Sequence, residues 1–168
     1  MLFMSCEEEK ANEQTVFLQA ESAGESDENS DEDYFDEVIL ATNLKKAGII
    51  DLHWLLLDSC SSCDVISNAQ LLTDIRKTDR WLSIRCNAGI RRTCMRGNLS
   101  GYGEVWYYSN GIANILSLSR VKDKYRVTYD SHKDNIFHVH KLDGKVLKFS
   151  ESSRRLYRFD VKNRDEYQ

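Results

Sequence analysis

A carboxylate stands directly after an apolar stretch in Trp54-Leu-Leu-Leu-Asp58, and the hydroxyl-rich segment Ser59-Cys60-Ser61-Ser62 follows it. An apolar strand fixes the position of such a carboxylate, and the hydroxyls and backbone N–H groups beyond it can share its charge. Two carboxylates of this kind, brought together, share one proton and hold a water between them. The ionised member acts as a general base on that water, and the protonated member polarises a carbonyl group. Acid–base hydrolysis at Asp58 is therefore the first functional hypothesis.

The cysteines offer a second kind of chemistry. Cys60 and Cys63 have the C-x-x-C spacing of a redox pair or of half a zinc site. The other half of a zinc site would come from one of two pairs, Cys86 with Cys94 or His138 with His140. Neither spacing is that of a common zinc module, and the chain has five cysteines, an odd number. We therefore expect small buried thiols, and neither a bound metal nor another cofactor.

Charge is divided unevenly along the 168 residues, although the net charge is only −4. Residues 1–38 contain thirteen acids and one base, which gives −12, whereas the fourteen acids and twenty-two bases of residues 39–168 give +8. The acidic segment is also rich in Ser, Asn and Gly, so it buries too little apolar surface to offset the entropy of ordering. We predict a disordered acidic arm at 1–38, a lead-in linker at 39–50, a folded domain at 51–161 and a polar tail at 162–168.

Short strands separated by turn residues dominate the expected secondary structure of the folded domain. Apolar and alternating patterns predict strands at His53–Asp58, Trp81–Cys86, Ile90–Arg96, Glu104–Tyr108, Tyr125–Tyr129, Ile136–Lys141, Lys145–Phe149 and Leu156–Val161. Apolar residues at helical spacing predict short helices at Ala69–Lys77 and Ile112–Val121. The glycine-rich segment Gly97–Gly103 is expected to be the tip of a long hairpin. Such a series indicates a mostly β barrel or sandwich.

The Asp58 segment resembles the retroviral-type aspartic protease signature, in which two apolar residues precede Asp, Ser or Thr, Gly and a small residue. The chain as a whole resembles the protease segment of copia-type retrotransposon Gag-Pol polyproteins, including the divergent group known from diatoms. The resemblance runs from Trp54 to Asp160. Beyond Asp58 it rests on Asp64-Val-Ile-Ser-Asn68 with Leu71-Leu72, Cys86-Asn-Ala-Gly89, Gly97–Tyr107, Gly111–Val121, Lys124–Thr128 and Phe137–Lys141.

This resemblance implies a retropepsin-like acid-protease fold, a β-barrel half with one or two short helices, in which Asp58 is the catalytic aspartate. Ser59 would cross-link the two active-site loops of a dimer, and Ser61 would hydrogen-bond the Asp58 carboxylate. A flap over the peptide substrate would include Gly97, Leu99, Gly101, Tyr102 and Gly103. Support for the catalytic loop would come from Asn114, Ile115, Leu116 and Ser117.

The chain departs from the family at Cys60, which stands where most members carry glycine. A Cβ at this position restricts the loop dihedrals and crowds the approach of the backbone to the carboxylate. Since only Asp58 has the hydroxyl-bearing loop, the chemistry requires a homodimer in which each chain supplies one aspartate. The resemblance implies peptide segments of a Gag-Pol polyprotein as substrate. It also implies a cytoplasmic location, including virus-like particles.

A second hypothesis belongs to another functional class. A catalytically dead retroelement fragment would act as a non-enzymatic β module that binds RNA or an acidic partner. Its basic surface would be the cluster of Arg85, Arg91, Arg92 and Arg96, which could contact phosphates. The longest apolar runs are too short to cross a membrane, so we expect no membrane partner.

Overall fold

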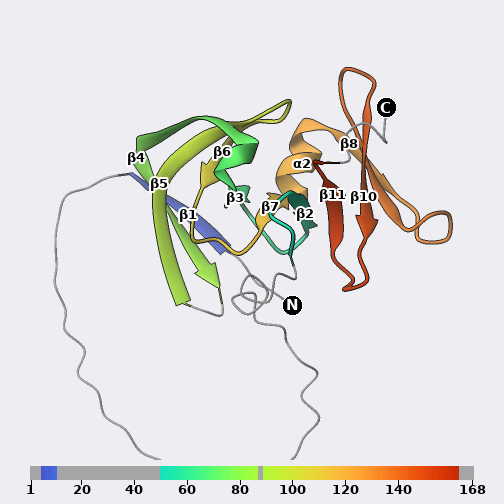
Figure 1. The fold of residues 1–168 in the computed structure, drawn as a ribbon, viewed down its shortest axis with the longest axis horizontal. Coiled ribbons are helices and arrows are strands. Elements are labelled where there is room, and N and C mark those ends of the chain that lie inside the picture. The colour runs from blue at the N-terminus through green and yellow to red at the C-terminus, as the bar shows by residue number, and fades with distance from the viewer. Residues whose placement is uncertain (1–4, 11–49, 87–88, 163–168) are drawn as a thin grey trace, which may run out of the picture.

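The structure, a computed structural model, describes residues 5–10, 50–86 and 89–162. Most of these residues lie in strands of one sheet, joined by a short 3₁₀ helix, η1, and one short α-helix, α2 (Figure 1). In chain order the elements are β1 Ser5–Lys10, β2 Trp54–Asp58, β3 Val65–Ile66, η1 Ala69–Leu71, β4 Leu72–Cys86, β5 Gly89–Leu99, β6 Gly103–Tyr107, β7 Asn114–Ser117, α2 Leu118–Lys124, β8 Arg126–Tyr129, β9 Ile136–His140, β10 Val146–Glu151 and β11 Tyr157–Asp160.

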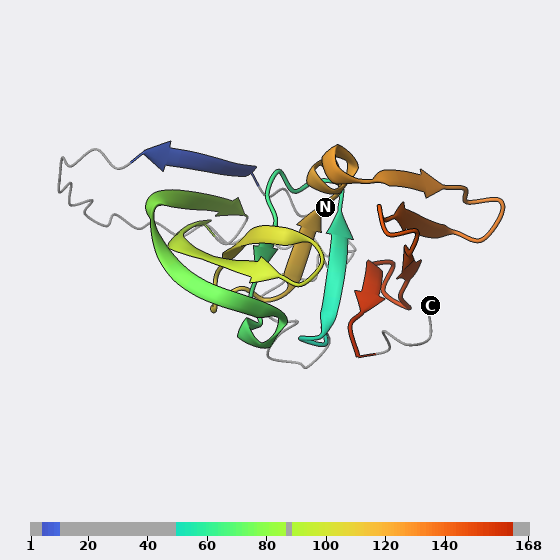
Figure 2. The same cartoon turned by 90° about the horizontal axis from the view of Figure 1, so that it is seen from above.

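The sheet has the strand order β1-β4-β5-β6-β3-β7-β2-β11-β10-β9-β8. Its end strands are β1 and β8, so the sheet is not closed into a barrel. Figures 1 and 2 show two wings, one around the β4–β5–β6 hairpins and the other around β8 to β11. Strands β2 and β7 pair in parallel between the wings. The prediction of a mostly β fold is confirmed at this level.

Strand β2 is an interior strand, because β7 flanks it on one side and β11 on the other. Its three leucines are all buried, and they alternate between two core clusters. Leu56 packs in the first cluster with Trp106 and Leu82, whereas Leu55 and Leu57 pack in the second. A strand covered on both faces reads as a continuous apolar run, which explains the unbroken Leu55-Leu56-Leu57 sequence.

One of the two expected helices is wrong and the other is shifted. Residues 69–77, expected as a helix, form only the single turn η1 before β4 begins at Leu72. Within residues 112–121 the chain first forms strand β7, and α2 begins only at Leu118. Ser117 caps α2, since its side chain accepts a hydrogen bond from the Arg120 N–H.

The acidic segment is partly ordered. Ser5–Lys10 form β1, which pairs antiparallel with β4 from Ser5 opposite Arg85 to Lys10 opposite Arg80. The expected disordered arm therefore does not include these six residues. Residues 11–38, almost all of the 39–50 linker and nearly all of the 162–168 tail lie outside the described residues. Within the described part of the chain, no helix has the length and apolar character needed to span a membrane.

Candidate active site

Asp58 ends strand β2 and lies opposite Ser117 of β7 in the parallel register. Its carboxylate is half-buried, and Oδ1 accepts a hydrogen bond of 2.8 Å from the backbone N–H of Cys60. Burial raises the pKa of this carboxyl above its ordinary value, and the Cys60 N–H opposes the rise. Asp58 is thus fixed by an enclosed strand, remains open to solvent and holds a proton more readily than an ordinary aspartate. These are properties of an acid–base residue.

Cys60 fits the loop without a backbone conformation that requires glycine. The described non-glycine residues with positive φ are Asp74, Asn135 and Arg155, so Cys60 has no left-handed backbone. Its thiol is half-buried, and the Sγ atom lies 3.9 Å from the hydroxyl of Ser59. The expected crowding by the Cβ does not prevent the N–H of residue 60 from reaching the carboxylate.

The two serines of the loop are placed differently. Ser59 is exposed, and its role across a dimer stays a prediction. Ser61 is buried, and its hydroxyl donates a 2.7 Å hydrogen bond to the backbone C=O of Cys63. Its hydroxyl therefore closes the loop on itself, and the expected hydrogen bond from Ser61 to the Asp58 carboxylate is replaced by this internal one.

Asp64 is a second carboxylate at the far end of the same loop, and it is only 8% exposed. Its Oδ1 accepts a hydrogen bond of 2.8 Å from the Ser117 N–H, and its Oδ2 accepts one of 2.8 Å from the Tyr102 hydroxyl. Burial raises the pKa of Asp64, and the two donors oppose the rise. Because both oxygens are occupied inside the protein, Asp64 joins three segments rather than presenting a reactive group.

The start of α2 clamps the Asp58–Asp64 loop from the other side. The Ser117 hydroxyl donates to the backbone C=O of Ser61 at 2.5 Å, and the Arg120 Nε donates to that of Ser62 at 3.2 Å. Lys124 lies one turn further along α2, and its Nζ is 3.6 Å from the centre of the Tyr102 ring. Burial lowers the pKa of this ammonium. Ser117 and α2 therefore contact the loop directly, and a role of Asn114–Ser117 in supporting a catalytic loop stays a prediction.

The glycine-rich segment Gly97–Gly103 is a tight turn anchored to the body of the protein. Gly97 and Leu99 are buried in β5, and the turn closes with Gly101 and Gly103 at positive φ. Besides the bond from Tyr102 to Asp64, the Tyr125 hydroxyl donates to the Gly101 C=O, and Lys124 donates to the Tyr102 C=O. A flap must move aside to admit its substrate. These contacts anchor the segment to Asp64 and to the end of α2, and its role as a flap stays a prediction.

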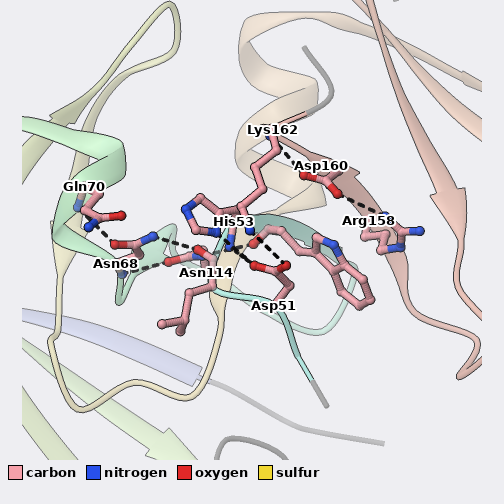
Figure 3. A network of polar contacts seen from close by, with 10 residues as sticks. Asp51, His53, Asn68, Gln70, Asn114, Arg158, Asp160 and Lys162 are labelled. Carbon is pink, nitrogen blue, oxygen red and sulfur yellow. Dashed lines mark hydrogen bonds and ion pairs between the residues drawn. The ribbon is translucent and has the colours of Figure 1, made fainter. Parts of the chain in front are cut away.

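Asn114 is fully buried at the opposite end of β7 from Ser117 (Figure 3). Its Oδ1 accepts hydrogen bonds from the backbone N–H groups of Ser67 and Asn68, at 3.0 and 2.9 Å. Its Nδ2 donates to the backbone C=O groups of Leu52 and Trp54, at 2.7 and 3.0 Å. Asn114 therefore ties the start of β2 to the segment before η1, and it acts on Asp58 only through the strand.

A second part of the network in Figure 3 holds the entry to β2. The Asp51 carboxylate accepts hydrogen bonds from the His53 N–H and from its ring Nδ1, at 2.8 and 2.9 Å. These bonds lower the pKa of Asp51 to about 2, with a smaller contribution from the Lys162 ammonium at 3.4 Å. Asp51 is thus a structural acid with a lowered pKa, whereas the pKa of Asp58 is raised.

Within the described part of the chain, the thiols and imidazoles do not gather at one place. Cys63 and Cys94 are buried cysteines outside any disulfide. His138 contacts Asp134 and His140 contacts Thr128 on the far wing. Over residues 5–10, 50–86 and 89–162, no three side chains of His, Cys, Asp or Glu lie together as a metal site requires. A zinc site built from the C-x-x-C pair therefore has no support in this part of the chain.

The arginine cluster divides into two groups. Arg91 and Arg92 are exposed on β5 opposite Ile84 and Ser83, and the exposed Arg85 lies one position further along β4. Arg96 instead lies over the Trp106 ring at 3.9 Å and forms an ion pair with Glu104 at 2.6 Å. Three of the four arginines therefore lie towards one end of the β4–β5 hairpin.

The positioning residues Asp64, Arg120 and Lys124 were missed by the sequence reasoning. Unlike Asp58, Asp64 follows a hydroxyl-rich loop and not an apolar strand, so its type and position in the sequence did not distinguish it from a surface acid. Its partners Tyr102 and Ser117 are 38 and 53 residues away, which no local pattern reveals.

Comparison with known proteins does not identify a family, since the chain matches no family model, no curated protein and no solved structure.

Proposed function

We propose that the chain is an aspartic endopeptidase of the retropepsin type, in which a homodimer brings two copies of Asp58 together. The observation that carries this proposal is the Asp58 carboxylate. It ends an enclosed strand, remains half-exposed, accepts the Cys60 N–H and has a raised pKa. The proposed substrates are peptide segments of a Gag-Pol-type polyprotein, the class implied by the sequence resemblance.

In this proposal the two Asp58 carboxyls share one proton and hold the attacking water. The ionised carboxylate takes a proton from the water, whose oxygen attacks the carbonyl carbon of the peptide bond. The protonated carboxyl gives its proton to the carbonyl oxygen, which yields a tetrahedral gem-diol. The intermediate collapses when the carboxyl that took the proton from the water gives it to the departing amide nitrogen. The other carboxylate takes a proton from a gem-diol hydroxyl, so a carboxylic acid and an amine are released and the dyad again shares one proton. The apparent pKa values of such a pair belong to the pair, not to either aspartate.

The supporting contacts around Asp58 favour this role over that of a surface acid. Ser117 and Arg120 hold the loop at Ser61, Ser62 and Asp64, and the pairing of β2 with β7 fixes its Asp58 end. Preorganised catalytic groups need such support from neighbouring residues. We extend the proposal to the fold: β2 to β7 with α2 would form the retropepsin-like barrel half, and β8 to β11 would extend the sheet.

The test is self-processing of the chain in its native polyprotein flanks, measured for the wild type and for Asp58→Asn. We expect cleavage in the wild type, none in the variant, and inhibition of the wild type by a statine-type transition-state analogue. The matched control is Asp79→Asn, because Asp79 is an exposed aspartate of β4 away from the loop. Cleavage that persists in Asp58→Asn would contradict the proposal.

The exposed pair Arg91 and Arg92 favours one alternative, a non-enzymatic β module that binds RNA. Reversing both charges would then abolish RNA binding, whereas Asp58→Asn would leave it intact. Arg126→Glu, an exposed change on β8 at the other end of the sheet, is the control for a general loss of positive charge. RNA binding that survives the Arg91 and Arg92 reversal would exclude this surface as the site.

A further inference from the structure

A cavity of about 440 Å³ opens between the β5–β6 turn and the strands of the β9–β10 hairpin. Its inner wall is apolar and consists of buried residues of the second core cluster, among them Leu99, Leu116, Val139, Phe149 and Phe159. Exposed residues such as Gln70, Ser100 and Lys145 also line it, so the cavity reaches solvent. Asp58 is not part of this lining, which separates the cavity from the proposed catalytic carboxylate.

The size and lining of the cavity point to a small-molecule ligand. Protein interiors contain few voids larger than a water molecule, because each void forfeits contacts between its walls. The apolar inner wall offers water no hydrogen-bond partners, so an apolar group that displaces water from this wall is favoured. Ligand sites typically have volumes of about 300–1,000 Å³, and this cavity falls in that range.

Lys141 supplies a positive charge at the mouth of the cavity. Its side chain is only 18% exposed, and its recorded ion pair is with Asp143 at 3.7 Å, longer than a hydrogen bond. The Nζ atom lies beside Gly101, since a Cβ built on that glycine would be 3.0 Å from it. Lys145, which is exposed, adds a second ammonium to the same lining. Asp143 also lines the cavity, so an anionic ligand would compete with this loose ion pair for the ammonium of the largely covered Lys141 side chain.

We propose that this cavity binds an amphipathic carboxylate, with the apolar tail against the core cluster and the carboxylate at Lys141. A medium-chain fatty acid has this chemistry. The floor around Phe149 and Leu116 would exclude water from the tail, and Lys141 with Lys145 would select for negative charge. The cavity lining includes Leu99, Gly101 and Tyr102 of the glycine-rich turn but not Asp58, so the inference does not require peptide hydrolysis at Asp58.

The test uses the full chain and decanoate below its micelle-forming concentration, with binding measured by calorimetry and by the thermal shift. We expect saturable binding with one decanoate per chain and a Tm that rises with ligand concentration. Lys141→Gln should weaken the affinity about tenfold by loss of a charge-assisted contact. Lys148→Gln is the matched control, because Lys148 is exposed on β10 and does not line the cavity.

Two further measurements keep the test decisive. Ser100→Trp adds bulk at the exposed turn without altering the core, and it should abolish decanoate binding while the far-ultraviolet circular dichroism stays unchanged. Decyltrimethylammonium, which has the same tail and the opposite charge, should bind at least about tenfold more weakly than decanoate. Absence of saturable decanoate binding, equal binding of the cation, or full binding in Ser100→Trp would each overturn the proposal.

Discussion

Asp58 combines partial burial with a single backbone donor, and this combination makes the stability of the fold depend on pH. Its pKa is raised in the folded state from 3.8, so the contribution of its protonated form is complete below that value. The contribution is lost as the pH rises through the folded pKa. Asparagine cannot ionise, and its Oδ1 still accepts the Cys60 N–H. We therefore expect Asp58→Asn to have a higher Tm than the wild type at pH 7.

Calorimetry across a pH series checks this expectation. The difference in Tm between Asp58→Asn and the wild type should be constant well below pH 3.8, grow as the pH rises above this ordinary pKa, and level off above the folded pKa. Asp79→Asn should show no such trend, since Asp79 is an exposed residue. A difference in Tm that does not change with pH would contradict the raised pKa of Asp58.

The Tyr102 hydroxyl is one of the two donors that stabilise the buried Asp64 carboxylate. Replacing Tyr102 by Phe leaves Oδ2 without this partner, which should cost about 1–3 kcal/mol of unfolding free energy at pH 7. The hydroxyl favours the ionised form of Asp64, so the pKa of Asp64 should rise further in the variant. The loss should therefore be smaller at acidic pH.

Urea unfolding of Tyr102→Phe at neutral and acidic pH measures both effects. Tyr108→Phe is the control, because Tyr108 is also half-buried but packs against the first core cluster, away from Asp64. We expect that control to change stability by less than about 0.5 kcal/mol. If Tyr102→Phe loses no more unfolding free energy than Tyr108→Phe, Asp64 does not anchor the glycine-rich turn that contains Tyr102.

Among the structural elements, β7 depends most on one side chain, that of Asn114. Alanine at this position removes the partners of two backbone N–H groups and two backbone C=O groups. Since each unsatisfied buried group costs about 1–3 kcal/mol, we expect a loss of at least about 3 kcal/mol in unfolding free energy. Asn110→Ala, at an exposed turn position, should be nearly neutral. Denaturant unfolding compares the two, and similar losses would contradict the assigned role.

Strand β4 shows where sequence patterns succeed and fail for an element. Leu72 and Ile75 both pack at the second core cluster, although they are three residues apart. The register with β5 shifts between Thr73 and Arg76, and Asp74 has a positive φ of 51°. This bulge breaks the two-residue alternation and produces a spacing that resembles a helix. Further along, Leu82 and Ile84 alternate regularly, and the strand there was predicted correctly.

At the scale of the whole molecule, the sequence predicts the kinds of element better than their arrangement. The C-terminal strands were found from local apolar patterns and Asp143-Gly144, which supplies a turn. The pairing of β2 with β11, in which Leu56 lies opposite Arg158, joins residues about a hundred positions apart. Asp58 can be found from the sequence because this aspartate directly follows an apolar strand. The contacts of Asp64 depend on how distant strands are arranged in the sheet. Local patterns carry no information on such pairings.

The proposed homodimer makes a quantitative prediction for mixtures of subunits, because each active site needs two Asp58 residues. Wild-type and Asp58→Asn chains, mixed in equal amounts and allowed to exchange, should form about one quarter of dimers with two aspartates. Peptidase activity should therefore fall to about one quarter of that of the same total amount of wild-type chain. Chains that act singly would retain about half, which would contradict the dimer. Activity per chain should also fall on dilution, as dimers dissociate.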